Sequence, residues 1–156
     1  MLSDSLSHNL RLLDTIWNGS ADLIVTRFCL GGISCAMLSC EGMVSSAMLS
    51  QMVLQPIHSI RQSFPDGDAL LSHLSTHLIL SADRKLLRNF AEISQSVSAG
   101  FVIFLADGAS EALAAAVQGF LSRTITQPDG EQNIYGAKEG FTESLPTNLS
   151  LLRRRM

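Results

Sequence analysis

The chain has few aromatic residues and few charges, and both shortages limit what it can be. Aromatic residues make up 6% of its 156 positions and charged residues 16%, whereas typical soluble domains have about 25% charged residues. The hydrophobic share is nevertheless 46%, which excludes a disordered chain and predicts an aliphatic, well-packed domain. Because charges are so scarce, we expect much of the surface to face neighbouring protein.

Positive charge is in short supply as well. The chain has 11 Lys and Arg residues against 14 Asp and Glu residues, which gives a net charge of −3. Such a balance provides no general attraction to nucleic acid, and we expect no nucleic-acid partner. The one basic concentration is the run Arg153–Arg155 at the C-terminal end.

Cysteine is limited to Cys29, Cys35 and Cys40, an odd number without a C-x-x-C pair. This pattern excludes the common zinc and redox motifs. All three residues lie within apolar runs, which favours reduced, buried thiols in a cytosolic compartment.

Long apolar runs are absent too. No unbroken stretch of about 18 apolar residues occurs, so no segment is predicted to cross a bilayer. Residues 1–17 lack the basic start and the long apolar centre of a signal peptide. Even the most apolar stretch, 22–40, is interrupted by Asp22 and Arg27.

The usual catalytic motifs are missing. The sequence contains no G-x-S-x-G nucleophile elbow, no phosphate-binding P-loop and no G-x-G-x-x-G dinucleotide motif. Asp107 and Glu111 could meet as an acid/base pair, but carboxylates beside a turn are far more often structural. We therefore predict a non-enzymatic protein without a cofactor.

Histidine and methionine each allow two interpretations. His73 and His77 would share a face of a helix, as zinc ligands can, but Leu74 stands where the H-E-x-x-H base would be, and no third ligand is evident. Surface or capping roles are favoured, and no metal is expected. The methionines could line an adaptable pocket or simply fill the core; they are Met37, Met43, Met48 and Met52.

The first sixty residues alternate between helical and strand patterns. Apolar residues spaced by three and four from Leu2 to Trp17 predict a helix that ends near Gly19. Residues 22–30 and 33–40 read as two strands joined by a Gly31-Gly32 hairpin turn. A helix capped by Ser45 should follow and bend at Pro56.

The next sixty residues also alternate between strand and helical patterns. Residues 78–80 are a short strand candidate, and Ser81 should cap a helix that runs through Ile93. The continuous apolar run 101–105 indicates a strand buried on both faces, and 111–120 is interpreted as its partner strand although its alanines favour a helix. We predict an α/β (α+β) fold, with a mixed sheet of about four to five strands packed by helices, in a single subdomain over 1–117.

Residues 118–156 are too polar for a core and too patterned for a random tail. They contain P-x-x-E at 128–131, G-x-K-E-G-F-T-E at 136–143, and N-L-x-L-x-R-R-R at 148–155. This order resembles the signature that closes the first soluble subdomain of the A subunit of GerA-type spore germination receptors. The ending E-G-M-V at 41–44 is also similar to the D-G-L-V pattern of that family. The SpoVA-type paralogue shares the signature and remains an alternative.

The resemblance implies a function as well as a fold. The chain would be the first subdomain of a membrane receptor subunit, followed by a second subdomain and by membrane helices that are not in this sequence. It would lie on the cytosolic face of the spore inner membrane, assemble with other germinant receptor subunits, and couple nutrient sensing to the membrane part. The alternative is a small-ligand module that binds a nutrient germinant in an apolar pocket.

The same resemblance supplies the candidate site. Segment 118–156 would form the joint to the second subdomain. The arginine run has three readings: a solvated end, a fork for an acidic partner, or positive charge beside a membrane. The candidate contact residues are Pro128, Glu131, Gly136, Gly140, Phe141, Glu143, Asn148, Arg153, Arg154 and Arg155.

Overall fold

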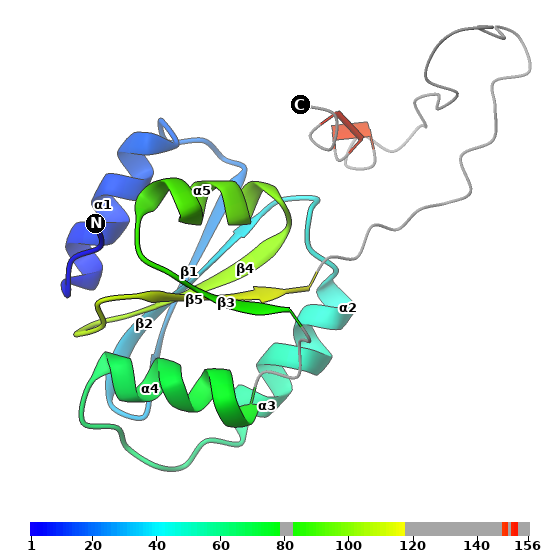
Figure 1. Cartoon of the computed structure of the whole chain (residues 1–156). Helices are drawn as coiled ribbons and strands as arrows, with labels where there is room; N and C mark the ends of the chain where they lie inside the picture. The colour runs from blue at the N-terminus through cyan, green and yellow to red at the C-terminus, as the bar shows by residue number, and fades with distance from the viewer. Residues whose placement is uncertain (79–82, 118–147, 150, 153–156) are drawn as a thin grey trace, which may run out of the picture.

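A sheet lies between two layers of helices (Figure 1). The computed structural model describes residues 1–78, 83–117, 148–149 and 151–152. The elements of the part before residue 118 are, in chain order, α1 (Leu6–Ile16), β1 (Leu23–Leu30), β2 (Ile33–Cys40), α2 (Ser46–Leu49), η1 (Ser50–Leu54), α3 (Gln55–His58), α4 (Gly67–His73), η2 (Leu74–Leu78), β3 (Arg84–Leu87), α5 (Phe90–Ser98), β4 (Phe101–Ala106) and β5 (Ala112–Ala116).

The described strands form a five-stranded sheet in the order β1-β2-β4-β5-β3. The predicted α+β class and strand number are confirmed, but the expected mixed sheet is wrong, because every neighbouring pair is antiparallel. Two of these pairs, β1–β2 and β4–β5, are joined by tight turns, which can only connect antiparallel strands. The chain reaches the far edge as β3 and returns to the centre as β4 through α5. Strands β3 and β4 therefore run parallel to each other, with β5 paired antiparallel between them.

Each face of the sheet carries its own hydrophobic cluster. Side chains of α1 and α5 pack on one face, and side chains of η1, α3, α4 and η2 pack on the other. Strand β4 contributes to both clusters, since its residues point alternately to the two sides and all six are buried. The prediction that 101–105 is a strand buried on both faces is therefore confirmed.

The first hairpin follows its sequence prediction closely. Leu23 pairs with Cys40 at one end and Leu30 with Ile33 at the other. Gly31 and Gly32 both have positive φ, a conformation that glycine adopts without strain. The prediction of three buried thiols holds for Cys35 and Cys40 but is wrong for Cys29, which is exposed, because β1 is an edge strand.

The helical segment after this hairpin is irregular. Ser45 caps α2 as predicted, with its side chain accepting a bond from the Met48 amide. The helix then continues as the wider π-turn η1 before α3 begins. Pro56 lies in the first turn of α3. Proline has no amide hydrogen to donate to the preceding turn, and a π-turn is one way to accommodate the missing bond.

The expected helix from Ser81 through Ile93 is wrong in its first half. Residues Arg84–Leu87 instead form β3, paired with β5 at the edge of the sheet. Helix α5 begins only after Asn89, whose side chain accepts a bond from the Glu92 amide. Residues 79–82 lie outside the described part, so the strand candidate at 78–80 is not tested there, although Leu78 itself ends the π-turn η2.

The predicted partner strand after β4 is confirmed as β5, over Ala112–Ala116. Four of its five residues are buried. Within the described ranges, no helix combines the length and apolar content that crossing a membrane requires. The boundary predicted at residue 117 and the role of 118–156 stay predictions.

Candidate functional site

Almost all of the predicted contact residues lie outside the part of the chain that the structure describes. Asn148 is the exception; it is half-buried, at the start of a helical turn. The contact site therefore stays a prediction at its other positions: Pro128, Glu131, Gly136, Gly140, Phe141, Glu143, Arg153, Arg154 and Arg155.

The carboxylates considered for acid/base chemistry have structural contacts. The Leu6 amide, at the start of α1, donates to Asp107 Oδ1 over 2.9 Å. Arg88 Nε donates to Glu111 Oε1 over 2.5 Å, and this bond and charge raise the pKa of Arg88. Each carboxylate therefore joins two segments that are distant in sequence, and neither faces the pocket described below.

The two histidines considered as ligands stack on each other. Their ring centres lie 4.8 Å apart with an angle of 20° between the rings. His73 also lies beside Phe64, at 5.1 Å between ring centres, and Gln62 Nε2 approaches its ring nitrogens. Among the described residues, no group of three potential ligands gathers around a possible metal position. The contacts of His73 are those of a packing residue at the surface of α4.

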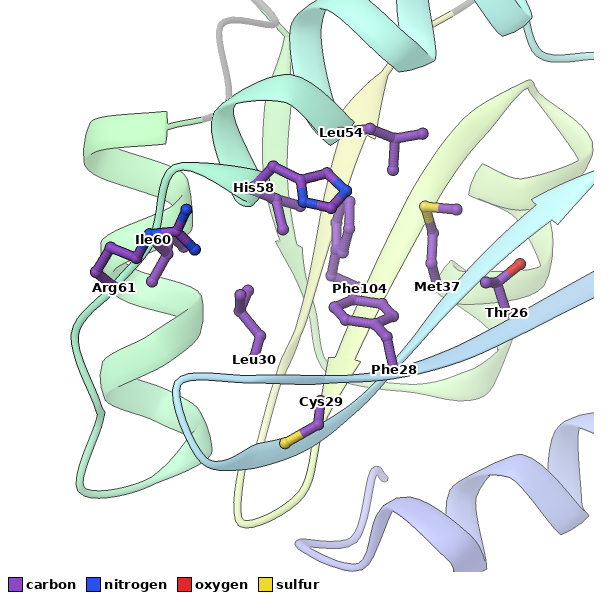
Figure 2. A pocket seen from close by; sticks show the side chains of 11 residues that line it. Thr26, Phe28, Cys29, Leu30, Met37, Leu54, His58, Ile60, Arg61 and Phe104 are labelled. Carbon is purple, nitrogen blue, oxygen red and sulfur yellow. The ribbon is translucent and has the colours of Figure 1, made fainter.

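Within the described residues, an apolar pocket of about 360 Å³ lies between the sheet and α3, and we call it the α3 pocket (Figure 2). The size falls at the lower end of the range for small-ligand sites, about 300–1,000 Å³. The sheet provides its floor, and η1, α3 and the residues after α3 provide its roof and rim. Its lining residues are Thr26, Phe28, Cys29, Leu30, Met37, Leu54, Ile57, His58, Ile60, Arg61 and Phe104.

The register of β1, β2 and β4 explains which side chains form the floor of the pocket. Thr26 lies opposite Met37, and Met37 lies opposite Phe104, so these three side chains form one row across β1, β2 and β4. Phe28 and Leu30 follow on the same face, because alternate residues of a strand share a face. Phe104 is 1% exposed and Met37 8% exposed, while Phe28 is half-buried. The pocket is thus deep over β4 and opens toward the edge strand β1.

The roof ends before it reaches this edge. Val53 and Ile57 are buried against the sheet, whereas Leu54 is 37% exposed at the opening. The π-turn η1 rotates the residues that follow it, and α3 then ends at His58. Figure 2 shows Leu54 and the His58 ring projecting from this segment toward the space above Phe28 and Phe104.

Gly31 permits a close contact between the β1–β2 turn and the segment that follows α3. Gly31 has a φ of +57°, and a Cβ on it would lie 2.4 Å from the Phe64 ring and 2.9 Å from the Gln62 carbonyl oxygen. The Phe64 amide also donates to the Gly31 carbonyl over 3.0 Å. The segment that follows Arg61 therefore rests directly on the β1–β2 turn.

The rim of the pocket carries basic side chains and no acidic one. His58 and Arg61 are the basic residues of its lining, and no Asp or Glu belongs to that lining. Both residues are exposed. Within the described ranges, neither makes an ion pair or a hydrogen bond with another side chain. The pocket therefore joins an apolar floor to a basic rim that has no internal counter-charge in the described part.

The sequence indicated only fragments of this pocket. It suggested that Met37 could line a pocket, and the alternation of 22–30 was enough to place Thr26 and Phe28 on one face. It gave no signal for His58 or Arg61, because their approach to the floor depends on the crossing of α3 over the sheet and on the π-turn before it.

Comparison with known proteins identifies a family that the chain matches. A model of the family described as Bacillus/Clostridium GerA spore germination protein matches residues 11–156. Two similar proteins come from Bacillus subtilis (strain 168). The uncharacterized membrane protein YfkQ is 30% identical over 99% of this chain and 30% of its own length. Spore germination protein KA is 27% identical over 99% of this chain and 28% of its own length.

A solved structure has the same fold. The N-terminal domain of the A subunit of the Bacillus megaterium spore germinant receptor GerK3 is 24% identical, with a TM-score of 0.74, over 99% of this chain and 56% of that one. This likeness shows that the sheet and its two helix layers recur there. The chain spans less than a third of the length of the two curated relatives.

Proposed function

This chain belongs to the GerA family of spore germination proteins, and from that premise we propose that it is an N-terminal domain of a germinant receptor subunit. In this role it takes part in germination by assembling with other receptor subunits and by coupling nutrient sensing to the membrane part. The observation that carries the proposal is the family match over residues 11–156. The fold shared with a receptor A-subunit domain supports it.

The proposed location is the cytosolic face of the spore inner membrane, with the membrane helices in another part of the full-length protein. A relative that is named as a membrane protein, and of which this chain covers 30%, supports this arrangement. The scarcity of charge, at 16% of residues, fits a domain that is largely surrounded by neighbouring protein. The partners in this proposal are other receptor subunits and a second soluble subdomain.

Segment 118–156 is proposed as the joint between the two subdomains. Its glycines permit close turns, and its arginines suit bidentate pairing with carboxylates. Glu143→Ala and Arg154→Ala, made in the full-length protein, are the direct test. We expect the germination rate at a fixed nutrient concentration to fall by about fivefold to 150-fold, which corresponds to typical coupling free energies of about 1–3 kcal/mol.

Two controls separate coupling from folding. The melting temperature of the 156-residue chain should not change in either variant, and Arg11→Ala, on the exposed surface of α1, should leave germination unaffected. Wild-type germination in both joint variants would contradict the proposed role of this segment.

A second candidate function is small-ligand binding, and the α3 pocket is the observation that favours it. The pocket has a suitable size, an apolar floor and a few polar groups at its rim, as small-molecule sites do. The test is calorimetry of the purified chain with candidate nutrients. Heat of binding and a raised melting temperature support the function, and the absence of both leaves the assembly role alone.

A further inference from the structure

We propose that the α3 pocket binds a small amphipathic monocarboxylate, with its apolar body on the floor and its carboxylate at the basic rim. The inference deepens the second candidate function, ligand binding, and rests on it. It assigns the chemical class of the ligand, which neither the fold nor the family membership supplies.

The floor of the pocket favours a ligand whose larger part is apolar and preferably aromatic. Phe28 and Phe104 both face the pocket from neighbouring parts of the sheet, and Met37 lies between the strands that carry them (Figure 2). Aromatic rings prefer offset or edge-to-face packing with other rings, and a methionine sulfur contacts ring edges favourably. A phenyl group therefore has partners on the floor that a polar group would lack.

The basic residues at the rim of the pocket favour a negatively charged ligand group. His58 and Arg61 both follow or end α3, so they stand on the same side of the opening. The Arg guanidinium presents planar N–H groups that match a carboxylate. The chain as a whole carries a net charge of −3, so this basic rim runs against its average charge. An anion gains an attraction here that a neutral or cationic analogue does not.

The same lining argues against a zwitterion. An α-ammonium group needs acceptors, preferably a carboxylate, and the lining contains neither Asp nor Glu. Its uncharged hydroxyl, that of Thr26, lies on β1, away from the residues after α3 (Figure 2). Placing an ammonium group beside Arg61 would add repulsion between two positive charges. A monocarboxylate should therefore bind better than the amino acid of the same shape.

Four probes with one shape and different charges test this class. They are 3-phenylpropionate, 3-phenylpropanamide, 3-phenylpropylamine and phenylalanine, titrated into the 156-residue chain by calorimetry or by NMR chemical shifts. We expect the carboxylate to bind most tightly. Loss of one charge-assisted contact should weaken the amide about tenfold, and the amine and the zwitterion should bind more weakly still.

Variants at the rim connect the binding to these residues. Arg61→Gln should weaken 3-phenylpropionate about tenfold, and Arg61→Glu should reverse the preference in favour of the amine. Because Arg61 is exposed, neither change should alter the thermal melt. Arg11→Gln removes the same charge from α1, on the opposite face of the sheet (Figure 1), and should leave binding unchanged.

Each outcome decides the matter. Equal affinity for all four probes, with no effect of Arg61→Gln, would overturn the carboxylate class while ligand binding itself stands. No binding of any probe would overturn the proposed ligand class, whereas the calorimetry with candidate nutrients tests ligand binding itself. A chain that dimerises, and that becomes a monomer in the Leu54→Asp variant, would show that a second copy covers the opening, and this result would also overturn the proposal.

Discussion

Cys35 is the residue whose chemistry the fold changes most clearly. Its side chain is 4% exposed, and burial raises the pKa of the thiol from 9.0 to about 12, with the neighbouring Cys29 and Asp107 acting in the same direction. A thiolate is the reactive form of cysteine, so this residue stays protonated and inert at neutral pH. Its role is to fill the sheet face beneath α4 and η1.

The shifted pKa predicts how stability depends on pH. Because the folded pKa lies above the unfolded one, the stabilisation is fully present below about pH 9 and is lost as the pH rises toward 12. Over that window the unfolded thiol loses its proton first, and the free energy of unfolding should fall by up to about 1.4 kcal/mol per pH unit. Urea denaturation between pH 8 and pH 10.5 measures this slope.

Two variants isolate the contribution of this thiol. Cys35→Ala should lose the slope that belongs to Cys35, although it is less stable overall because it leaves a small cavity. Val97→Ala, destabilised at a buried position on the other face, keeps the thiol and should keep the slope. If the curves of the wild-type and Cys35→Ala chains run parallel above pH 9, the assigned shift is wrong.

At the scale of elements, what the sequence could predict depended on whether local signals were sufficient. The hairpin over 22–40 was predictable, since two glycines and alternating apolar residues define it without help from the rest of the chain. Strand β3 was not, because Arg84–Leu87 shows no alternation and becomes a strand by pairing with the alanines of β5. One usable signal was overlooked: Asn89 and Glu92 form a capping pair, and they mark the true start of α5.

The start of α1 depends on a residue from a distant turn. Asp107 accepts the Leu6 amide, the Asp107 amide donates to Ser34, and the Gly108 amide donates to Asp4. A carboxylate at a helix N-terminus satisfies an amide that has no partner within the helix and interacts favourably with the helix dipole. The β4–β5 turn therefore fastens α1 to the sheet.

This contact yields a prediction for one substitution. Asp107→Ala should lower the free energy of unfolding by about 1 kcal/mol, the usual effect of removing a capping group. It should also speed hydrogen exchange in the first turn of α1 more than in α5. Asp107→Asn keeps an acceptor and should cause a smaller loss. Asp14→Ala, at an exposed position in the last turns of the same helix, is the matched control, and an equal loss there would contradict the fastening role.

At the scale of the whole molecule, one sheet serves two hydrophobic clusters. Val53 belongs to the cluster under η1 and α3, and Val97 belongs to the cluster under α5. Both are fully buried, and both clusters use alternate residues of β4. Since neither helix layer has a core without the sheet, we expect the two clusters to form and melt together.

Two matched substitutions, one on each face, test this expectation. Val53→Ala and Val97→Ala should each lower the free energy of unfolding by about 2 kcal/mol, from lost burial and the remaining cavity. Because the sheet separates the two sites, the double variant should lose the sum of the two values within about 0.5 kcal/mol. All four chains should unfold in one transition when circular dichroism and tryptophan fluorescence are followed together in urea. The fluorescence reports on Trp17, beside the α1–α5 cluster, so a fluorescence change that separates from the circular dichroism change in either variant would mean that the two faces are independent folding units.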